Sequence, residues 1–452
     1  MTGKDLLENL NSSRATELFL ALYGTDGLDA ARQRYCRLIE ELLRDAPGAF
    51  PQNEFPEVAG ELRLFSVPGR TELGGNHTDH NQGKVLAASI QLDAVAIAAP
   101  RRDKQVFFRS TGHRDVIVDL SELSPRENEK GNTEALIRGI AAEFAAQGTP
   151  VKGFTANAAS MVLAGSGLSS SAAVEVLFAK MFDSLCCGDK RSALDLAKMG
   201  QKAENVYFGK PCGLMDQIAC ASGGVVAMDF GDFQNPQARG ISFDPAAAGL
   251  ALCVADTKGS HVDLTPDYAA IPNEMKSVAA FFGKTVLREL DEEILLAHMA
   301  ELRKSAGDRA VLRALHFFSE NRRVDAMLAA LENLDGLPPD VSPEKKKALT
   351  EKFLALVRES GDSSWEFLQN IYSPKNSREQ GISLALALTK SFLSASCGAC
   401  RVHGGGFAGT IQTYLPLESL EEYRRLMEGV FGKGSITALK IRPYGAAELL
   451  LG

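Results

Sequence analysis

Short apolar and β-branched runs separated by turn residues predict a β-rich region between about residues 60 and 125. Runs of this kind, bounded by Gly, Pro, Asn and Asp, are typical of strands joined by turns. The predicted strands are Leu62–Val67, Val85–Ile90, Ala94–Ala99, Val106–Arg109 and Val116–Leu120. This part of the chain is therefore predicted to form a sheet.

Apolar positions spaced three and four residues apart predict helices on both sides of this region. Residues 1 to about 50 are predicted to be helical. Further helices are predicted at Thr133–Gln147, Ala172–Leu185 and Arg191–Phe208, and further strands at Gly153–Met161 and Gly224–Asp229. These elements complete a first half in which strands and helices are mixed.

After about residue 240 the pattern changes to one strand followed by long helical stretches, and the chain ends on alternating helices and strands. The predicted elements are Leu250–Asp256, Met275–Leu302, Val311–Phe318, Pro343–Glu359, Gly381–Ala395, Thr410–Leu415, Leu417–Phe431 and Ile436–Ile441. That rhythm is typical of an α+β layer. We predict an α+β protein with a helical extension at residues 1–55, a first domain at 56–240 and a second domain at 241–452.

Composition limits the function classes. A chain of 452 residues with 45% hydrophobic and 23% charged residues is ordinary globular protein, long enough for two domains. A net charge of −8 without a basic stripe argues against a nucleic-acid partner. No apolar run has the length of a spanning helix and the start lacks the apolar core of a signal peptide, so we expect a cytoplasmic protein without a membrane partner.

The cysteines predict neither a disulfide framework nor a metal site. Eight cysteines in a chain of this length are expected to be reduced and mostly buried. Cys397 and Cys400 form a lone C-x-x-C without a second pair at zinc-finger spacing. Chemistry must therefore be sought elsewhere in the chain.

The first candidate is the segment Pro68–Asn81, called the first segment below. It packs Arg70, His77, Asp79 and His80 between two predicted strands. Its glycines allow close backbone approach to a small polar ligand, whereas the same composition also suits an ordinary polar turn. The segment alone leaves both interpretations open.

The second candidate is the serine loop, Leu163–Ala173, which runs straight into a predicted helix. Free backbone N–H groups at a helix N-terminus bind anions, and three consecutive serines add hydroxyls and a potential magnesium ligand. A simple N-cap needs only one serine, so phosphate binding is the better hypothesis. The loop has neither a Walker lysine nor dinucleotide-binding glycine spacing.

Three further features are weaker. Glu204 and Asp216 flank a Gly/Pro turn and could converge on a phosphate-bound metal, or one of them could accept a proton, although solvated carboxylates are common there. The glycine segment, His403–Thr410, predicts close backbone approach to a ligand or a flexible hairpin. His261 and Tyr268 could reach a site from the second domain, although each is more often structural.

In this order the three segments resemble the motifs of the GHMP sugar and metabolite kinases, and within them those of the galactokinase family. The resemblance rests on Pro-Gly-Arg with His-Thr-Asp, on Gly-x-Gly-Leu-Ser-Ser-Ser-Ala, and on Gly-Gly-Gly-Phe-x-Gly, with Cys212–Gln217 close to the galactokinase form. It extends from about residue 60 to the C-terminus. It implies a two-domain GHMP kinase fold: an N-terminal mixed β/α domain and a C-terminal ferredoxin-like domain with extra helices.

The resemblance also implies roles for individual residues, with ATP and Mg²⁺ bound between the domains. The phosphates would lie in the loop formed by Gly165, Ser166, Gly167, Leu168, Ser169, Ser170 and Ser171. Ser171 and Glu204 would hold the magnesium ion. Asp216 would take or orient the proton of the anomeric hydroxyl, with Arg70 beside it. The sugar would be bound by Asn76, His77, Asp79, Gly213 and Tyr268.

The first segment departs from the family's usual Pro-Gly-Arg-Val-Asn-Leu-Ile-Gly-Glu-His-Thr-Asp-Tyr. This chain has Thr71, Glu72, Gly74, Asn76 and His80 in the variable places. Asn76 stands where the family has a Glu that accepts a hydrogen bond from the sugar's 6-hydroxyl. An amide can still pair with a hydroxyl, whereas loss of the charge would also permit a 6-carboxylate such as that of galacturonate.

The predicted function is therefore transfer of the γ-phosphoryl group of ATP to the anomeric hydroxyl of galactose, giving galactose 1-phosphate. One alternative is the same reaction on another hexose derivative, such as galacturonate or an amino sugar. A second is a non-catalytic sensor of sugar and ATP, against which the presence of Arg70, Asp216 and Glu204 argues. The expected partners are a small sugar and ATP, and the sequence leaves the oligomeric state open.

Overall fold

The larger of two sheets forms the centre of the computed structural model, which describes residues 2–49, 62–162, 165–259, 264–338, 341–394 and 397–451. Its strand order is β12-β1-β2-β5-β3-β4, and β6 pairs with β2 and β7. The strands are β1 Arg63–Gly74, β2 Lys84–Pro100, β3 Gln105–Ser110, β4 Val116–Asp119, β5 Phe154–Ser160, β6 Val225–Asp229, β7 Gln237–Ile241 and β12 Ala447–Glu448. His261 and residues 163–164 of the serine loop lie outside the described residues.

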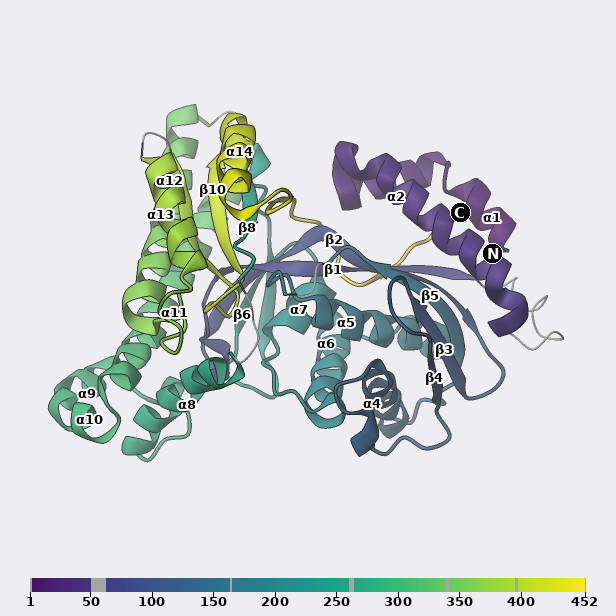
Figure 1. Cartoon of the computed structure of the whole chain (residues 1–452), viewed down its shortest axis with the longest axis horizontal. Coiled ribbons are helices and arrows are strands. Elements are labelled where there is room, and N and C mark those ends of the chain that lie inside the picture. The colour runs from purple at the N-terminus through teal and green to yellow at the C-terminus, as the bar shows by residue number, and fades with distance from the viewer. Residues whose placement is uncertain are drawn as a thin grey trace.

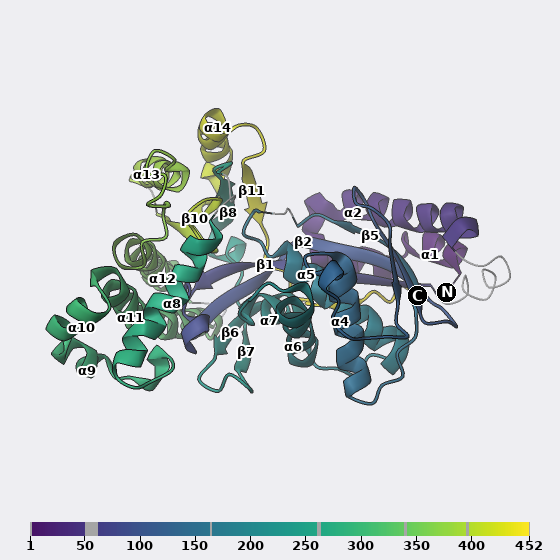
Figure 2. The same ribbon diagram turned by 60° about the horizontal axis from the view of Figure 1, so that its bottom comes forward.

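Helices cover both faces of this sheet because its strands are apolar on both sides. Successive residues of a strand point to opposite faces, and in β1 Leu64 packs with the N-terminal helices whereas Phe65 and Val67 join the main core. One face carries α1 Gly3–Asn9 and α2 Ser13–Ala49 (Figures 1 and 2). The other carries α4 Thr133–Ala146, α5 Ser170–Phe182, α6 Ala193–Lys202 and α7 Met215–Ser222.

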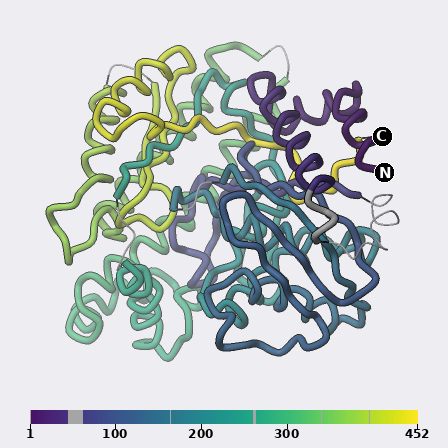
Figure 3. Tube along the Cα trace, turned by 45° about the vertical axis from the view of Figure 1, so that its right-hand side comes forward, coloured from purple at the N-terminus to yellow at the C-terminus, as the bar shows by residue number. Residues whose placement is uncertain are grey.

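A buried ion cluster on β2 ties the N-terminal helices to the end of the chain. The fully buried carboxylate of Asp93 accepts hydrogen bonds from Tyr23 at 2.7 Å and Arg34 at 2.7 Å of α2, and from Arg442 at 3.0 Å. The two chain ends lie side by side (Figure 3), and Ser12 Oγ donates to the carbonyl of Leu451. The predicted helical extension is thus packed onto the sheet.

The smaller sheet has the ferredoxin-like arrangement expected for the second half of the chain. Its order is β11-β8-β10-β9, with β8 Leu250–Asp256, β9 Ala399–His403, β10 Thr410–Pro416 and β11 Ile436–Leu439. Helix α13 Gly381–Leu393 precedes β9 and helix α14 Leu420–Phe431 precedes β11, which completes a split βαβ unit. Between β8 and α13 the chain inserts the extra helices α8 Thr265–Phe281, α9 Glu292–Ala297, α10 Met299–Ser305, α11 Asp308–Asp335 and α12 Pro343–Ser363.

Several predicted boundaries were wrong. Strand β1 continues through Gly74, so half of the first segment is strand and not loop, and β2 merges two predicted strands. The predicted helix Met275–Leu302 is broken into α8, α9 and α10, and β7, β9 and β12 were not predicted. The domain division at residues 55 and 240 stays a prediction, and β12 returns from the chain end to pair with β1. None of the helices described here is long and apolar enough to cross a membrane.

Candidate functional site

The first segment and the glycine segment face each other across a small pocket of about 150 Å³. Strand β1 brings the first segment to this point, and the turn between β9 and β10 brings the glycine segment. The pocket is lined by Arg70, Glu72, Asn76, His77, Asp79, His80, Gly213, Met215, Asp216, Gly404 and Gly405. Six of the seven residues predicted to be catalytic or to bind the sugar are among them, and Tyr268 is the seventh.

At one end of the pocket Arg70 and Asp216 form an ion pair. The Nε of Arg70 donates to Asp216 Oδ1 at 2.8 Å, and Ser169 Oγ donates to Asp216 Oδ2 at 2.7 Å. Arg70 also donates to the carbonyl of Gly167. Two distant parts of the sequence therefore converge on the carboxylate of a third.

The ion pair keeps Asp216 ionised. Burial by itself raises the pKa of this carboxyl, but the charge of Arg70 and the hydroxyl of Ser169 outweigh burial and lower it below its ordinary value. Asp216 lies in the first turn of α7, where the helix dipole also favours a negative charge. Its side chain is 34% exposed, so the carboxylate remains open to the pocket.

The described part of the serine loop wraps tightly around Arg70. Gly165 and Gly167 have φ angles of 76° and 70°, and Ser169 adopts the same left-handed region at φ 60°, which is uncommon for a residue with a side chain. The backbone N–H of Arg70 donates to the carbonyl of Leu168 at 3.0 Å. Strain at a serine that contacts Asp216 is typical of a functional loop.

The residues predicted to bind phosphate differ in whether their side chains are open to a ligand. Ser170 and Ser171 begin the 13-residue helix α5, and Ser171 is exposed, so its hydroxyl is open to a ligand. The first N–H groups of a helix lack intrahelical partners and suit an anion. The side chain of Leu168 is buried in the main core, which leaves only its backbone for a nucleotide. Ser169 turns its hydroxyl to Asp216 and not outward.

The predicted magnesium ligand Glu204 lies beside a second buried carboxylate, Glu175. Glu204 belongs to the helical turn Ala203–Phe208 and pairs with Lys210 at 3.1 Å. The amide of Gln217 donates to Glu175 at 2.9 Å and to Glu204 at 3.3 Å. Burial first, and then the charge of Glu204, raises the pKa of Glu175 well above its ordinary value. A cation near this pair would offset the repulsion between them.

These residues fit a magnesium ion. Glu175 lies four residues after Ser171 on α5, so both point along the same helix face. Glu175 Oε1 is buried without a hydrogen-bond partner among the described residues. Mg²⁺ usually takes one or two carboxylates together with waters and substrate phosphates, so three acidic ligands are unnecessary. Accordingly, no cluster of three or more His, Cys, Asp or Glu side chains with metal-binding geometry occurs among the described residues.

Within the same pocket Asn76 is held by protein groups. Its Nδ2 donates to Glu72 Oε1 at 3.1 Å and to the carbonyl of Gly404 at 2.8 Å. Its Oδ1 accepts from the amide of Asn370 at 2.9 Å. Glu72 in turn forms a buried ion pair with Arg401 of β9. Glu72, Arg401 and Asn370 were not predicted to be site residues. Of these three, only Glu72 could have been noticed in the sequence, because it differs from the family's usual residue.

His77 and Asp79 present acceptors to the pocket. The Nε2–H of His77 donates to the carbonyl of Gly405 at 3.0 Å, which leaves Nδ1 as an acceptor. Burial first, and then His80, lowers the pKa of His77 to about 3, so the ring is neutral. The carboxylate of Asp79 packs against Gly213, where an added Cβ would lie 2.0 Å from Asp79 Oδ2. Gly213 therefore leaves room for the carboxylate.

Tyr268 is placed behind the glycine segment and is not among the residues that line the pocket. Its hydroxyl donates to the carbonyl of Gly406 at 3.1 Å, and a Cβ on Gly405 would lie 2.6 Å from its ring. His403 is buried, and burial lowers the pKa of its ring well below the ordinary value, so the ring is neutral. Its Nε2 lies 3.0 Å from the hydroxyl of Thr71 and its Nδ1 lies 3.0 Å from the hydroxyl of Thr410. These contacts hold the two pocket walls in register.

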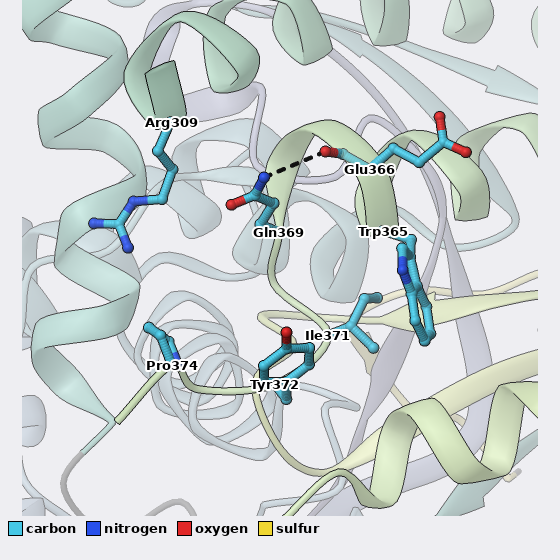
Figure 4. Close-up of a pocket in the computed structure, with 7 residues that line it drawn as sticks. All are labelled: Arg309, Trp365, Glu366, Gln369, Ile371, Tyr372 and Pro374. Atoms are coloured by element: carbon cyan, nitrogen blue, oxygen red, sulfur yellow. Dashed lines mark hydrogen bonds between the residues drawn. The ribbon is translucent and has the colours of Figure 1, made fainter. Parts of the chain in front are cut away.

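A larger hollow of about 460 Å³ lies between α11 and the segment 365–374 (Figure 4). Trp365 and Glu366 of the helical turn Ser364–Leu368 lie on one side of it and Arg309 of α11 on the other. None of the predicted site residues is among those that line it, and the guanidinium of Arg309 is already paired with Glu274. The smaller pocket is therefore the candidate active site.

Comparison with known proteins places these features in a family. A model of the GHMP kinase N-terminal domain matches residues 135–224, and a model of the galactokinase galactose-binding signature matches residues 53–100. The chain is 30% identical to human galactokinase over 424 residues, which are 91% of this chain and 98% of the human protein. It is 29% identical to the galactokinase of Streptomyces coelicolor over 411 residues, 89% of this chain and 95% of that protein.

Solved structures share the fold. Lactococcus lactis galactokinase in complex with galactose matches with a TM-score of 0.70 at 23% identity, covering 88% of this chain and 98% of that one. A mevalonate kinase matches with a TM-score of 0.57 at 14% identity, covering 84% and 98%. The predicted GHMP kinase fold is therefore confirmed.

Proposed function

This chain belongs to the galactokinase family, and we propose that it transfers the γ-phosphoryl group of ATP to the anomeric hydroxyl of galactose, yielding galactose 1-phosphate. The observation that carries the proposal is the convergence of Arg70, Ser169 and Asp216 at one end of the pocket. This end adjoins the serine loop, so a sugar hydroxyl there would lie next to bound phosphate.

Arg70 and Asp216 have different roles at the reacting oxygen: Asp216 contacts the hydroxyl proton, and Arg70 stabilises negative charge. The ionised Asp216 accepts a hydrogen bond from the anomeric hydroxyl. This bond orients the hydroxyl so that a lone pair of the sugar oxygen faces the γ-phosphorus. Because its pKa is lowered, Asp216 is too weak a base for early proton abstraction and receives the proton late, as bonding to phosphorus proceeds. Arg70 offsets negative charge between the carboxylate and the transferred group.

The nucleotide phosphates are assigned to the serine loop and the first turn of α5. Ser170 and Ser171 lie in the first turn of this helix, where backbone N–H groups and the helix dipole favour a phosphate. Ser171 and Glu204 would hold Mg²⁺, with Glu175 beside them. When bound, the ion neutralises phosphate oxygens and aligns the γ-phosphoryl group.

The sugar-binding side of the pocket consists of His77, Asp79, Gly213 and Asn76. Carboxylates suit this role because each can accept from two vicinal hydroxyls. Asn76 is assigned to the C6 substituent. Tyr268 supports the glycine segment behind this wall.

A panel of sugars tests the proposal. ADP release would be measured with galactose, glucose, galactosamine and galacturonate, and the phosphorylated position would be read by ³¹P NMR. We expect the highest kcat/KM with galactose and a product phosphorylated at C1. Turnover of another sugar above galactose would replace the substrate, and binding of sugar and ATP without ADP release would show a sensor.

A further inference from the structure

The far wall of the sugar pocket is built from a buried carboxylate and a buried amide that touch each other. Glu72 is 2% exposed and Asn76 1% exposed, and both line the pocket. The Nδ2 of Asn76 lies 3.1 and 3.3 Å from the two carboxylate oxygens of Glu72. A change in the charge or hydrogen bonding of one side chain therefore affects the other.

The hydrogen-bonding capacity of Asn76 toward a ligand follows from these contacts. Its Nδ2 faces the Glu72 carboxylate and the Gly404 carbonyl, which only accept, so the orientation of the amide is fixed and both N–H groups are used. Its Oδ1 accepts one bond from Asn370 and keeps one lone pair. Asn76 therefore offers a sugar one acceptor and no donor.

Arg401 holds Glu72 in its charged form. Its guanidinium is fully buried and forms an ion pair with Glu72 Oε1. Burial raises the pKa of Glu72 above its ordinary value, while Arg401 and then Arg70 act in the opposite direction. Because Arg401 is always charged and would otherwise be buried alone, the pair is most stable with Glu72 ionised. The wall therefore carries a carboxylate as well as an amide oxygen.

The sequence departure at this wall is an exchange. The family motif has Asn at position 72 and Glu at position 76, whereas this chain has Glu72 and Asn76. The contact between the two positions means that one carboxylate and one amide remain in the same wall. The wall therefore keeps its negative charge, which lies on Glu72 and not on residue 76.

We propose that Glu72 determines the specificity of the sugar site by making this wall accept only hydrogen-bond donors. A neutral sugar with a free hydroxyl at C6 satisfies the wall, and a sugar acid is rejected. A 6-carboxylate would find no donor on Asn76 and a like charge on Glu72, which is discrimination by repulsion and unmet hydrogen bonds. This inference rests on the proposed function, in which Asn76 faces C6.

The unaltered protein provides the first test. Values of kcat/KM are measured for galactose, galacturonate and 6-deoxygalactose, which present a hydroxyl, a carboxylate and a methyl group at C6. We expect galacturonate to be at least about 100-fold worse than galactose. We expect 6-deoxygalactose to be at least about tenfold worse, because it would leave a buried acceptor of the wall unpaired. Comparable turnover of galactose and galacturonate would overturn the inference but not the proposed function. No turnover of galactose would overturn the proposed function itself.

Exchange variants provide the second test. Glu72→Gln keeps the shape of the side chain and removes its charge, so the preference for galactose over galacturonate should fall at least tenfold. The double variant Glu72→Asn/Asn76→Glu should restore the preference to within about threefold, whereas each single change should not. A purely structural role of Glu72 would lower both activities equally and leave the ratio unchanged, which would overturn the inference. If Glu72→Gln does not fold, the double variant and the substrate panel decide.

Discussion

Arg70 lies 2.8 Å from the carboxylate of Asp216, although 146 positions separate them in the sequence. The first segment thereby reaches the first turn of α7, and Ser169 of the serine loop contacts the same carboxylate from the other side. Each of the following predictions tests one relationship of this kind at or near the pocket.

Asp216→Asn should lower kcat at least about 100-fold while the Kd of galactose changes less than about threefold. The amide keeps the shape of the side chain but loses the charge that orients the hydroxyl and receives its proton. Turnover by ADP release and binding by calorimetry would separate the two effects. Asp308→Asn, in an exposed ion pair with Arg303, is the matched control and should behave as wild type. An active Asp216→Asn enzyme would show that another group accepts the proton.

Gly213→Ala should raise the KM for galactose about tenfold or more, with little change in the KM for ATP. The new Cβ would lie 2.0 Å from Asp79 Oδ2 and displace the carboxylate that faces the sugar. Gly240→Ala, at a glycine where a Cβ meets open space, is the control and should leave both KM values unchanged. An unchanged KM for galactose in Gly213→Ala would exclude Asp79 from sugar binding.

Glu204→Gln should raise the Mg²⁺ concentration that gives half-maximal activity about tenfold or more. The substitution removes the carboxylate that is proposed to hold the ion with Ser171 and leaves the contacts with Lys210 and Gln217 partly in place. Titration of Mg²⁺ in the activity assay and calorimetry with a non-hydrolysable ATP analogue measure this effect. Glu143→Gln, which breaks an ion pair with Lys202 away from the loop, should not change the requirement. Equal Mg²⁺ dependence in both variants would remove Glu204 as a ligand.

Glu320→Gln should destabilise the protein at neutral pH and flatten its response to acid. Burial raises the pKa of Glu320, but His316, Arg323, Arg401 and the hydroxyl of Ser360 lower it to about 2. A carboxyl with a lowered pKa stabilises the fold above its unfolded-state pKa, and this stability is lost as the pH falls towards 2. A carboxyl whose pKa falls from 4.5 to about 2 on folding contributes about 3 kcal/mol to the stability at neutral pH.

The effect of Glu320→Gln would be measured by denaturant unfolding at pH 7, 5, 4 and 3. Between pH 5 and pH 3 the wild type should lose more stability than the variant. The control is Glu332→Gln on the same helix, which removes an exposed ion pair with Arg239. Its stability should depend on pH as that of the wild type does. Parallel pH profiles for wild type and Glu320→Gln would contradict the assignment. Since the backbone N–H of Gly75 donates to Glu320 at 3.0 Å, the variant also reports on support of the first segment.

The limits of sequence prediction are clear at β1 and β9. The Gly- and Pro-containing first segment suggested a loop, yet β1 continues through Pro68–Gly74 because β2 pairs alongside it with register shifts that absorb the irregular residues. Strand β9 was not predicted because its Arg401 and His403 are polar yet buried, and their partners Glu72 and Thr71 lie on the distant strand β1. Pairing partners of this kind are not visible in local periodicity.

By itself the sequence determined the family, the α+β class and most of the pocket-lining residues, because catalytic and turn residues must follow one another at fixed spacing along the chain. It identified Arg70, Asp79 and Asp216 without showing that they share one pocket. Only the tertiary structure showed that Glu72 and Asn76 touch, that Arg401 forms a buried ion pair with Glu72, and that Asn76 has no donor left for a sugar. The reason is physical: hydrogen-bond capacity depends on which groups are brought within 3 Å by distant strands, and this is a property of packing.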